Sequence, residues 1–385
     1  MAHQEDQSEP SAGSKGRGSN LMLFPYALVI LITLLVASGV PSHQRIGTKS
    51  STENRPKSII FFVGLTGLIL TLVSALRWRV GTDYWSYEVL YTSYIKEPFS
   101  EFTFFSEPGI RVLAKFGAHI NAQLGQASDP ALMFAFAAAL TIPLMVWTIY
   151  KSTNMFAFAI LLFILTTTWQ STFNGVRQYI ACAILFWGHQ YILSRHFRKY
   201  FVIVFIASLF HISAAIMLLV YWLPRKVLKP HALLLLAVVS IVAISSFSSV
   251  LEVISVVKSE SLTTGGYVSR QINPLRIGIS LAPILVYILF STKSRLGERE
   301  HFYLNMLIVN TALLVVSLNS AYFARFTIYT SIYACVLIPN LINMRDVNTR
   351  RLTILFIVVC YSLLWILETR QQPEMLYRTI FSRPT

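Results

Sequence analysis

The sequence predicts an all-α protein, a polytopic bundle of transmembrane helices. Apolar residues make up 55% of the 385-residue chain and charged residues only 13%, about half the usual charged share of a soluble domain. The apolar residues also form long uncharged runs, of which the clearest are 21–40, 58–76, 130–150, 155–170 and 232–251. A helix needs about 20 apolar residues to cross a bilayer core, and such runs leave no polar face for water.

The apolar pattern predicts about ten spans, at 21–40, 58–76, 130–150, 155–170, 176–193, 231–250, 275–290, 302–318, 323–341 and 352–368. These spans are expected to form one domain over residues 21–370, with a disordered polar tail at 1–20 and a C-terminal tail at 371–385. No charged region and small-residue cleavage site frame 21–40, so this first span is expected to be retained.

The segment 201–223 is long enough to cross the membrane once, but a re-entrant hairpin is the alternative. Basic residues flank it on both sides, namely Arg195, Arg198 and Lys199 before it and Arg225, Lys226 and Lys229 after it. Because Lys and Arg in short loops prefer the cytoplasm, these flanks favour a hairpin that enters and leaves on one side, with His211 near its tip. A single crossing would move every later loop to the other side.

The net charge of +15 follows from this topology. With the N-terminus outside and 201–223 as a hairpin, the short cytoplasmic loops hold 17 Lys and Arg residues against 4 Asp and Glu. Nucleic-acid binding is therefore not expected, because the positive charge marks the inner face. Two long loops remain outside, at 77–129 and 252–274.

Residues 107–121 of the first outer loop carry apolar side chains at helical spacing, including Ile110, Leu113 and Ala114. This pattern predicts a short amphipathic helix that lies at the membrane surface. Glu107 opens the helix. It is either a cap that interacts with the helix dipole or a residue that contacts the substrate.

The densest polar cluster begins where the second span ends, with Arg77, Arg79, Asp83, Tyr84 and Tyr87. One interpretation is an ordinary interface, with snorkelling arginines and an aromatic belt. The other is a site in which arginine forks bind phosphate oxygens, the carboxylate is held ionised, and tyrosine rings and hydroxyls contact sugars.

Arg177 and Gln178 lie in the first turn of the fifth expected span, at its outer end, and Arg325 holds a similar position in a later span. A cation is unfavourable at a helix N-terminus, so we expect an anion such as a phosphate beside it, aided by free backbone N–H groups. Arg270 and Arg276, in and after the second outer loop, are weaker candidates.

His211 is flanked by apolar residues on both sides. An ionisable side chain inside a membrane is a functional candidate, and histidine exchanges protons near neutral pH. The alternative is a buried histidine that merely hydrogen-bonds a carbonyl.

No nucleotide or metal motif occurs in the sequence: GxxxxGK[ST], GxSxG and HExxH are all absent. The three cysteines lie inside apolar runs, at Cys182, Cys335 and Cys360. Neither a metal nor a cofactor is expected.

Five motifs in order resemble the EpsG-like group of bacterial Wzy-type polysaccharide polymerases, over about residues 58–345. They are the span end 76–84, Glu107-Pro108-Gly109, the span start 177–181, the segment 209–214 around His211, and 322–325 before a span that ends in Ile338-Pro339.

This resemblance implies a glycosyltransferase at the outer, periplasmic face of the bacterial inner membrane. Such enzymes transfer a chain held on undecaprenyl diphosphate to a hydroxyl of another lipid-linked unit. The expected partners are this lipid-linked oligosaccharide, membrane lipids, a flippase and a chain-length regulator.

The resemblance also implies roles for the candidate residues, without a metal. Arg177 and Arg325, with Arg77 and Arg79, would bind the diphosphates. Asp83 or His211 would act as the general base. Tyr84, Tyr87 and Glu107 would contact sugars, and Gln178 would help to bind the substrate.

Two other functions remain open from the sequence. A membrane acyltransferase that modifies surface glycans needs an intramembrane histidine with a polar partner, and no partner of His211 is evident. A transporter or flippase of lipid-linked oligosaccharides predicts a charged central cavity and internal repeats, but the charges gather at one face and no convincing repeat occurs.

Overall fold

The computed structural model describes residues 12–42, 56–123, 125, 129–245, 275–291, 296–318, 321–343 and 346–383. Over these residues the fold is all-helical and contains no β-sheet. The expected second outer loop, 252–274 with Arg270, lies outside the described residues, as do residues 1–11 of the expected N-terminal tail.

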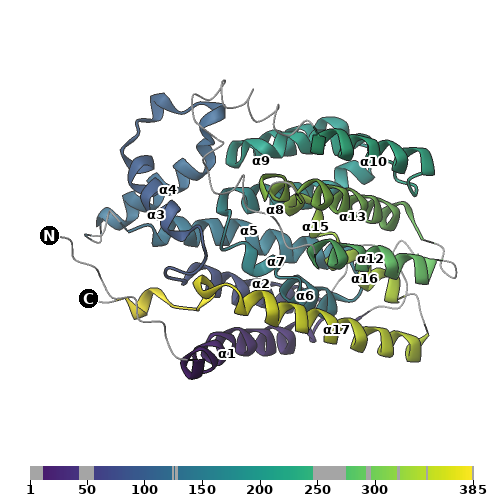
Figure 1. Ribbon diagram of the computed structural model, residues 1–385. Helices are drawn as coiled ribbons and strands as arrows, with labels where there is room; N and C mark the ends of the chain where they lie inside the picture. The colour runs from purple at the N-terminus through teal and green to yellow at the C-terminus, as the bar shows by residue number, and fades with distance from the viewer. Residues whose placement is uncertain are drawn as a thin grey trace.

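The long helices run side by side in one bundle (Figure 1). They are α1 (Ala12–Ala37), α2 (Lys57–Ala75), α5 (Ala131–Ser152), α8 (Val176–Leu193), α10 (Pro230–Ser245), α12 (Leu275–Ser291), α13 (Glu298–Val316) and α17 (Val347–Arg370). The pairs α2–α5 and α5–α8 form central contacts. Most of their buried apolar side chains belong to one core, while Phe134 of α5 and Val176 of α8 belong to a second cluster with α3 and α4.

The chain is a membrane protein by the length and composition of its helices. Among the described residues, four helical stretches are long and apolar enough to cross a bilayer: Lys57–Ala75, Ala131–Ser152, Arg325–Ile342 and Val347–Arg370. Helix α17 also exposes large apolar side chains such as Leu352 and Phe356, as expected for a face in contact with lipid. Five further apolar helices are shorter, so the count of about ten spans stays a prediction.

The expected span 155–170 is shorter and broken in the structure. Helix α6 (Phe156–Leu165) ends before Thr167, which has a φ of 60°, and a short helix α7 (Thr168–Ser171) follows. The Thr166 hydroxyl donates to the carbonyl of Leu162 at 2.7 Å, the kind of local hydrogen bond that bends or ends a helix.

The expected span 323–341 is likewise interrupted rather than continuous. Its segments are α14 (Ala321–Ala324), the 3₁₀ turn η6 (Arg325–Thr327), α15 (Ile328–Ser331) and α16 (Ala334–Asn343). Arg325 thus starts a tight turn instead of an ordinary helix.

The hairpin interpretation of 201–223 is confirmed. Helix α9 (Phe197–Phe210) ends at His211, and the 3₁₀ helix η4 (Ile212–Trp222) returns along it. The hydroxyl of Tyr200 donates to the carbonyl of Met217 at 2.8 Å across the two arms. The two basic flanks therefore lie at the same end, as their charge pattern predicts.

The first outer loop folds into helices that cover one end of the bundle. They are α3 (Tyr84–Lys96) and α4 (Pro108–Gln123), with short 3₁₀ turns η2 (Phe99–Glu101) and η3 (Phe104–Ser106) between them (Figure 1). Helix α4 confirms the expected amphipathic helix, and its buried face comprises Ile110, Ala114, Gly117 and Asn121.

Residues 12–20 of the expected N-terminal tail belong to α1 in the structure, and the division into a tail and a transmembrane domain stays a prediction. No proline that could end the helix lies between Pro10 and the apolar run that begins at residue 21. The helix therefore extends on the N-terminal side of the apolar residues.

Residues 371–383 of the expected C-terminal tail, here termed the C-terminal strap, contact the outer loop. Its backbone carbonyls at Glu374 and Arg378 accept from Gly81 and Trp78, each at 2.8 Å. Arg383 additionally pairs with Asp129 at 2.5 Å. These contacts fix the strap to the outer loop. They also provide hydrogen-bond partners for backbone groups that leave water.

Candidate functional site

Two adjoining cavities open at the end of the bundle that carries α3 and α4. The smaller, here termed the charged cleft, has a volume of about 180 Å³. Its wall residues are Asp83, Ser86, Tyr87, Leu90, Gly175, Arg177, Gln178, His211 and Arg325. The larger, here termed the large cavity, has a volume of about 730 Å³. Asp83, Gly175, Gln178 and Arg325 belong to both walls, so the two spaces meet at these residues.

The Gly-Thr-Asp turn docks directly on the start of α8. Gly81 has a φ of 106°, and a Cβ there would lie 2.5 Å from the Asn174 side-chain oxygen, so only glycine fits. The carboxylate of Asp83 accepts from the backbone N–H of Gly175 at 2.9 Å. These contacts bring together two motifs about ninety residues apart and fix Asp83 at the junction of the cavities.

Two backbone N–H groups at the start of α8 have partners within the protein. Asp83 accepts from Gly175, and the Tyr87 hydroxyl accepts from the backbone N–H of Arg177 at 3.2 Å. These two N–H groups are therefore already engaged and are not free to bind a phosphate.

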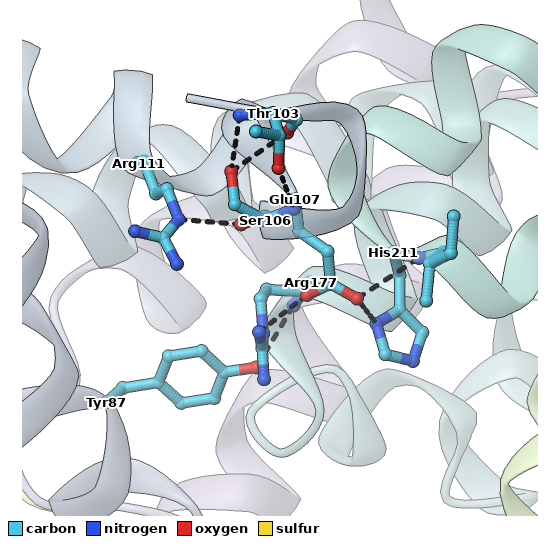
Figure 2. Close-up of polar contacts among 8 residues, drawn as sticks. Tyr87, Thr103, Ser106, Glu107, Arg111, Arg177 and His211 are labelled. Atoms are coloured by element: carbon cyan, nitrogen blue, oxygen red, sulfur yellow. Dashed lines mark hydrogen bonds and ion pairs between the residues drawn. The ribbon is translucent and has the colours of Figure 1, made fainter. Parts of the chain in front are cut away.

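Glu107 joins Arg177 and His211 into one cluster (Figure 2). Its Oε2 lies 2.5 Å from an Arg177 guanidinium nitrogen, and its Oε1 lies 2.6 Å from Nδ1 of His211. The backbone N–H of Ile212 donates to the same Oε1 at 3.1 Å. Three segments distant in sequence thus meet at a single carboxylate whose side chain is only 8% exposed.

The carboxylate of Glu107 is the anion that compensates Arg177. Burial by itself would raise the pKa of Glu107, but the hydrogen bond from His211 and the charge of Arg177 outweigh it and hold the pKa below its ordinary value of 4.5. The anion expected beside Arg177 is therefore part of the protein, and a phosphate is not required to explain this arginine.

The local sequence explains how Glu107 reaches this position. Glu107 has a φ of 55°, so it is not an ordinary helix cap, and Pro108 starts α4 directly after it. A Cβ on Gly109 would lie 2.6 Å from the ring of Phe210, the residue before His211. Glycine at this position lets the start of α4 approach the hairpin tip closely.

The turn before Glu107 is fixed by its own hydrogen bonds, also drawn in Figure 2. The Thr103 side chain accepts from the backbone of Ser106 at 3.3 Å, and Nε of Arg111 donates to the Ser106 carbonyl at 2.6 Å. This network holds the backbone of Glu107, so the carboxylate is positioned before any ligand binds.

His211 presents a defined ring nitrogen to the cleft. Its Nδ1 faces Glu107, so Nε2 is the nitrogen left for a ligand. Among the described residues, Nε of Arg177 has no hydrogen-bond partner, and this arginine also lines the cleft. The arrangement offers a proton acceptor and a guanidinium donor to one small space.

In the large cavity, charged side chains are partly neutralised by pairing. Arg276 forms two contacts with the carboxylate of Glu368, at 3.2 and 2.8 Å. The side-chain amide of Gln178 donates to the backbone carbonyl of Arg325 at 2.6 Å, which holds the η6 turn at the shared wall. Within the described part of the chain, no group of three His, Cys, Asp or Glu side chains could hold a metal ion.

Comparison with known protein families identifies the chain. The sequence model of the EpsG family matches residues 60–379, which is most of the chain. The chain belongs to the EpsG family. This confirms the resemblance carried by the sequence motifs and indicates a role like that of a polysaccharide polymerase. No curated protein and no solved structure shows significant similarity to the chain.

This EpsG-family protein brings most of the predicted site residues together. Asp83, Tyr87, Arg177, Gln178, His211 and Arg325 line the charged cleft, and Glu107 binds two of them. Their roles in catalysis remain proposals.

Arg77 lies apart from both cavities, contrary to its expected role on a phosphate. It is only 2% exposed, it lies over the rings of Phe134 and Phe173, and it donates to backbone carbonyls. Burial lowers the pKa of Arg77 to about 10. This position indicates a structural role: the guanidinium connects the end of α2 to the start of α8.

Arg79 and Tyr84 are likewise absent from the walls of both cavities. The guanidinium of Arg79 lies 4.0 Å from the ring of Trp85 and 3.8 Å from Glu88, on the surface of α3. Tyr84 is buried and stacks on Phe134. The interface interpretation fits the position of Arg79, whereas Tyr84 belongs to the packed interior between α3 and α5.

The sequence analysis did not single out most polar wall residues of the large cavity, among them Gln170, Asn174 and Glu368. Their signal was weak but present. Each is a polar side chain near the outer end of an expected span, where a residue facing lipid would be apolar.

Proposed function

We propose that the protein is a glycosyltransferase that polymerises oligosaccharide units held on undecaprenyl diphosphate, at the outer face of the bacterial inner membrane. The observation that carries the proposal is the charged cleft, in which Arg177, Arg325 and His211 meet in a space of about 180 Å³. Family membership supports the same class of reaction.

The reaction needs a charge to be stabilised and a proton to be removed. The acceptor hydroxyl oxygen bonds to the anomeric carbon of the donor sugar, and the bond from that carbon to the diphosphate oxygen breaks. The diphosphate leaves with the electron pair, and the guanidinium groups of Arg177 and Arg325 bind its oxygens. The hydroxyl proton passes to Nε2 of His211.

Glu107 acts through its neighbours in this scheme. Its contact with Nδ1 fixes the ring of His211, directs Nε2 toward the cleft and stabilises the imidazolium after proton transfer. Its contact with Arg177 holds that guanidinium at the wall. The earlier expectation of a sugar contact for Glu107 is replaced by this positioning role.

Asp83 is assigned to the acceptor rather than to proton removal. One carboxylate oxygen accepts from Gly175, while the residue lines both cavities at their junction. It is therefore suited to accept a hydrogen bond from a sugar hydroxyl and orient it. Tyr87 acts indirectly, because its hydroxyl holds the backbone of Arg177.

The charge pattern supports an outer location for the cleft. The two arms of the hairpin start and end near Arg195 and Arg225, and His211 lies at the opposite, cleft end. Since basic residues in short loops prefer the cytoplasm, the cleft is assigned to the other face.

A deletion strain complemented with the Arg177→Ala variant tests the proposal. Loss of a charge-stabilising side chain is expected to lower chain elongation by about a hundredfold or more, so gels of surface polysaccharide would show single units instead of a ladder. Arg195→Ala is the control, because Arg195 forms an exposed ion pair with Glu298 and should leave the ladder unchanged. A normal ladder from Arg177→Ala at normal protein level would refute the proposed site.

One observation also favours the acyltransferase alternative. Glu107 supplies the polar partner of His211 that the sequence did not reveal. The two functions differ in outcome: a His211→Ala strain with normal chain length but without acetyl groups would support acyl transfer. Short chains with unchanged acetylation would support polymerisation.

A further inference from the structure

The wall of the large cavity differs in chemistry from that of the charged cleft. More than half of its residues are uncharged and bear a hydroxyl or an amide, for example Thr168, Asn174, Ser280 and Thr327. Its Arg276 and Glu368 pair with each other. Such a wall offers many donors and acceptors but little net charge, which suits a ligand rich in hydroxyl groups.

Gln170 is the most informative residue of this wall. It is only 3% exposed, and among the described residues neither its amide nitrogen nor its amide oxygen has a hydrogen-bond partner. A buried polar group without a partner destabilises a protein, so such groups normally acquire one. Both amide atoms are buried in the structure, but the residue lines the cavity, so a turn of the side chain brings them to the ligand. A ligand hydroxyl can both donate and accept, and so satisfies either end of the amide.

We propose that the large cavity is a saccharide-binding chamber that holds the sugar units of the substrate, while the charged cleft holds its diphosphate. The inference rests on the proposed function and adds where each part of the substrate binds. A volume of about 730 Å³ lies within the range of about 300–1,000 Å³ that is usual for ligand sites.

The junction of the two cavities fits this division. Asp83, Gln178 and Arg325 line both spaces, so a ligand with sugar in one and diphosphate in the other has its sugar–phosphate bond beside them. That bond is the one the proposed reaction breaks, and Arg325 is one of the two arginines assigned to the leaving group.

The C-terminal strap forms part of the chamber wall. Gln371, Gln372 and Glu374 line it, and the Glu374 carbonyl also accepts from Gly81 in the turn that positions Asp83. The strap thus connects the chamber to the junction, which gives this polar segment a role beyond a simple tail.

Binding by the full-length protein in lipid nanodiscs tests the inference with two probes. One is the repeat-unit oligosaccharide released by mild acid from the parent strain's lipid-linked units, without lipid or phosphate. The other is undecaprenyl diphosphate without sugar. Gln170→Leu should weaken oligosaccharide binding at least tenfold and change binding of the lipid diphosphate less than twofold. Arg177→Ala should weaken binding of the lipid diphosphate at least tenfold and change oligosaccharide binding less than twofold.

Gln170→Leu should also keep or raise the melting temperature, because it removes an unpartnered buried amide. If this variant does not fold, Gln372→Ala in the strap replaces it, with the same expected loss of oligosaccharide binding. Oligosaccharide binding that survives both wall variants but is lost in Arg177→Ala would overturn the chamber and leave the polymerase proposal intact. Failure of the wild type to bind either probe would overturn both.

Discussion

Two histidines in the described part of the chain lie on or beside α8, and their surroundings differ: His189 is buried, whereas His211 is partly exposed. His211 faces the start of α8, where Glu107 and Arg177 contact each other and Arg177 lines a cavity. His189 lies twelve residues further along α8 than Arg177, about 18 Å at the usual helical rise. Its Nε2 lies 3.0 Å from the hydroxyl of Tyr303, its Nδ1 contacts the carbonyl of Phe186, and it lines neither cavity.

A similar contrast separates the two buried glutamates. Glu107 contacts two side chains that both line the charged cleft. Glu300 instead accepts from the backbone of Gly297 at 3.1 Å and from the side chain of Asn340 at 3.3 Å, at the start of α13. A buried ionisable residue in a membrane bundle therefore does not by itself indicate function. The distinguishing feature is a polar atom that remains available to a cavity.

The largest expected effect comes from comparing the two histidines. His211→Ala should lower chain elongation by about a hundredfold or more, because a general base is lost. His189→Ala should lower the melting temperature through its lost contacts and the space left, yet leave elongation per folded protein within about threefold. The measurement is the polysaccharide ladder of each variant strain, divided by its level of folded protein. Equal losses of elongation in the His211 and His189 variants would contradict the distinction between the two histidines.

The two glutamates give the next largest difference. Glu107→Gln keeps the size of the side chain but loses the charge that orients His211 and holds Arg177. Elongation should fall about tenfold to a hundredfold, as for other carboxylates that orient a functional histidine. Glu300→Gln is the matched control and should elongate normally. If Glu107→Gln has wild-type ladders, the positioning role is wrong.

Gly81 and Gly125 sharpen the account of the Gly-Thr-Asp turn. Both have positive φ, but a Cβ would collide with Asn174 only at Gly81 and meets nothing within 4 Å at Gly125. Gly125→Ala should cost about 1 kcal/mol of stability from backbone strain alone. Gly81→Ala should cost about 2 kcal/mol or more and slow elongation about tenfold, because Asp83 shifts. Equal stability losses in thermal unfolding would argue against tight docking.

The smallest expected effect is a dependence of stability on pH. Because the pKa of Glu107 is lowered in the folded protein, its contribution is present above the ordinary value of 4.5 and is lost as the pH falls through the lowered pKa. Melting temperatures of wild type and Glu107→Gln should therefore converge as the pH falls from 5 to below the lowered pKa of Glu107. A difference that stays constant over this window would contradict the ionised carboxylate.

Much of the fold follows from local sequence patterns. Apolar runs predict the helices, the basic residues on both sides of 201–223 predict the hairpin, and helical spacing after Glu107 predicts α4. The sequence also places Asp83, Arg177 and Arg325 at the outer ends of spans and His211 at the hairpin tip, which agrees with their common position in the charged cleft. For the helices, the hairpin and α4, the physical signal lies within a few turns of chain.

The remainder depended on contacts between distant segments. No spacing rule links Glu107 to His211, and the positive φ of Glu107 is not evident from its residue type. Arg77 looked like a surface arginine, but the aromatic rings of Phe134 and Phe173 enclose it. The strap contacts the outer loop through backbone carbonyls and the side chain of Arg383, and no local pattern in the sequence indicates these partners.

The central claim is that Arg177 and Arg325 bind the diphosphate of a lipid-linked substrate beside His211. Its most direct test is an electron cryomicroscopy structure of the full-length protein in nanodiscs, prepared with undecaprenyl diphosphate. The account predicts phosphate density in the charged cleft, within hydrogen-bond distance, about 3 Å, of both guanidinium groups. An empty cleft with the lipid diphosphate bound elsewhere would contradict it.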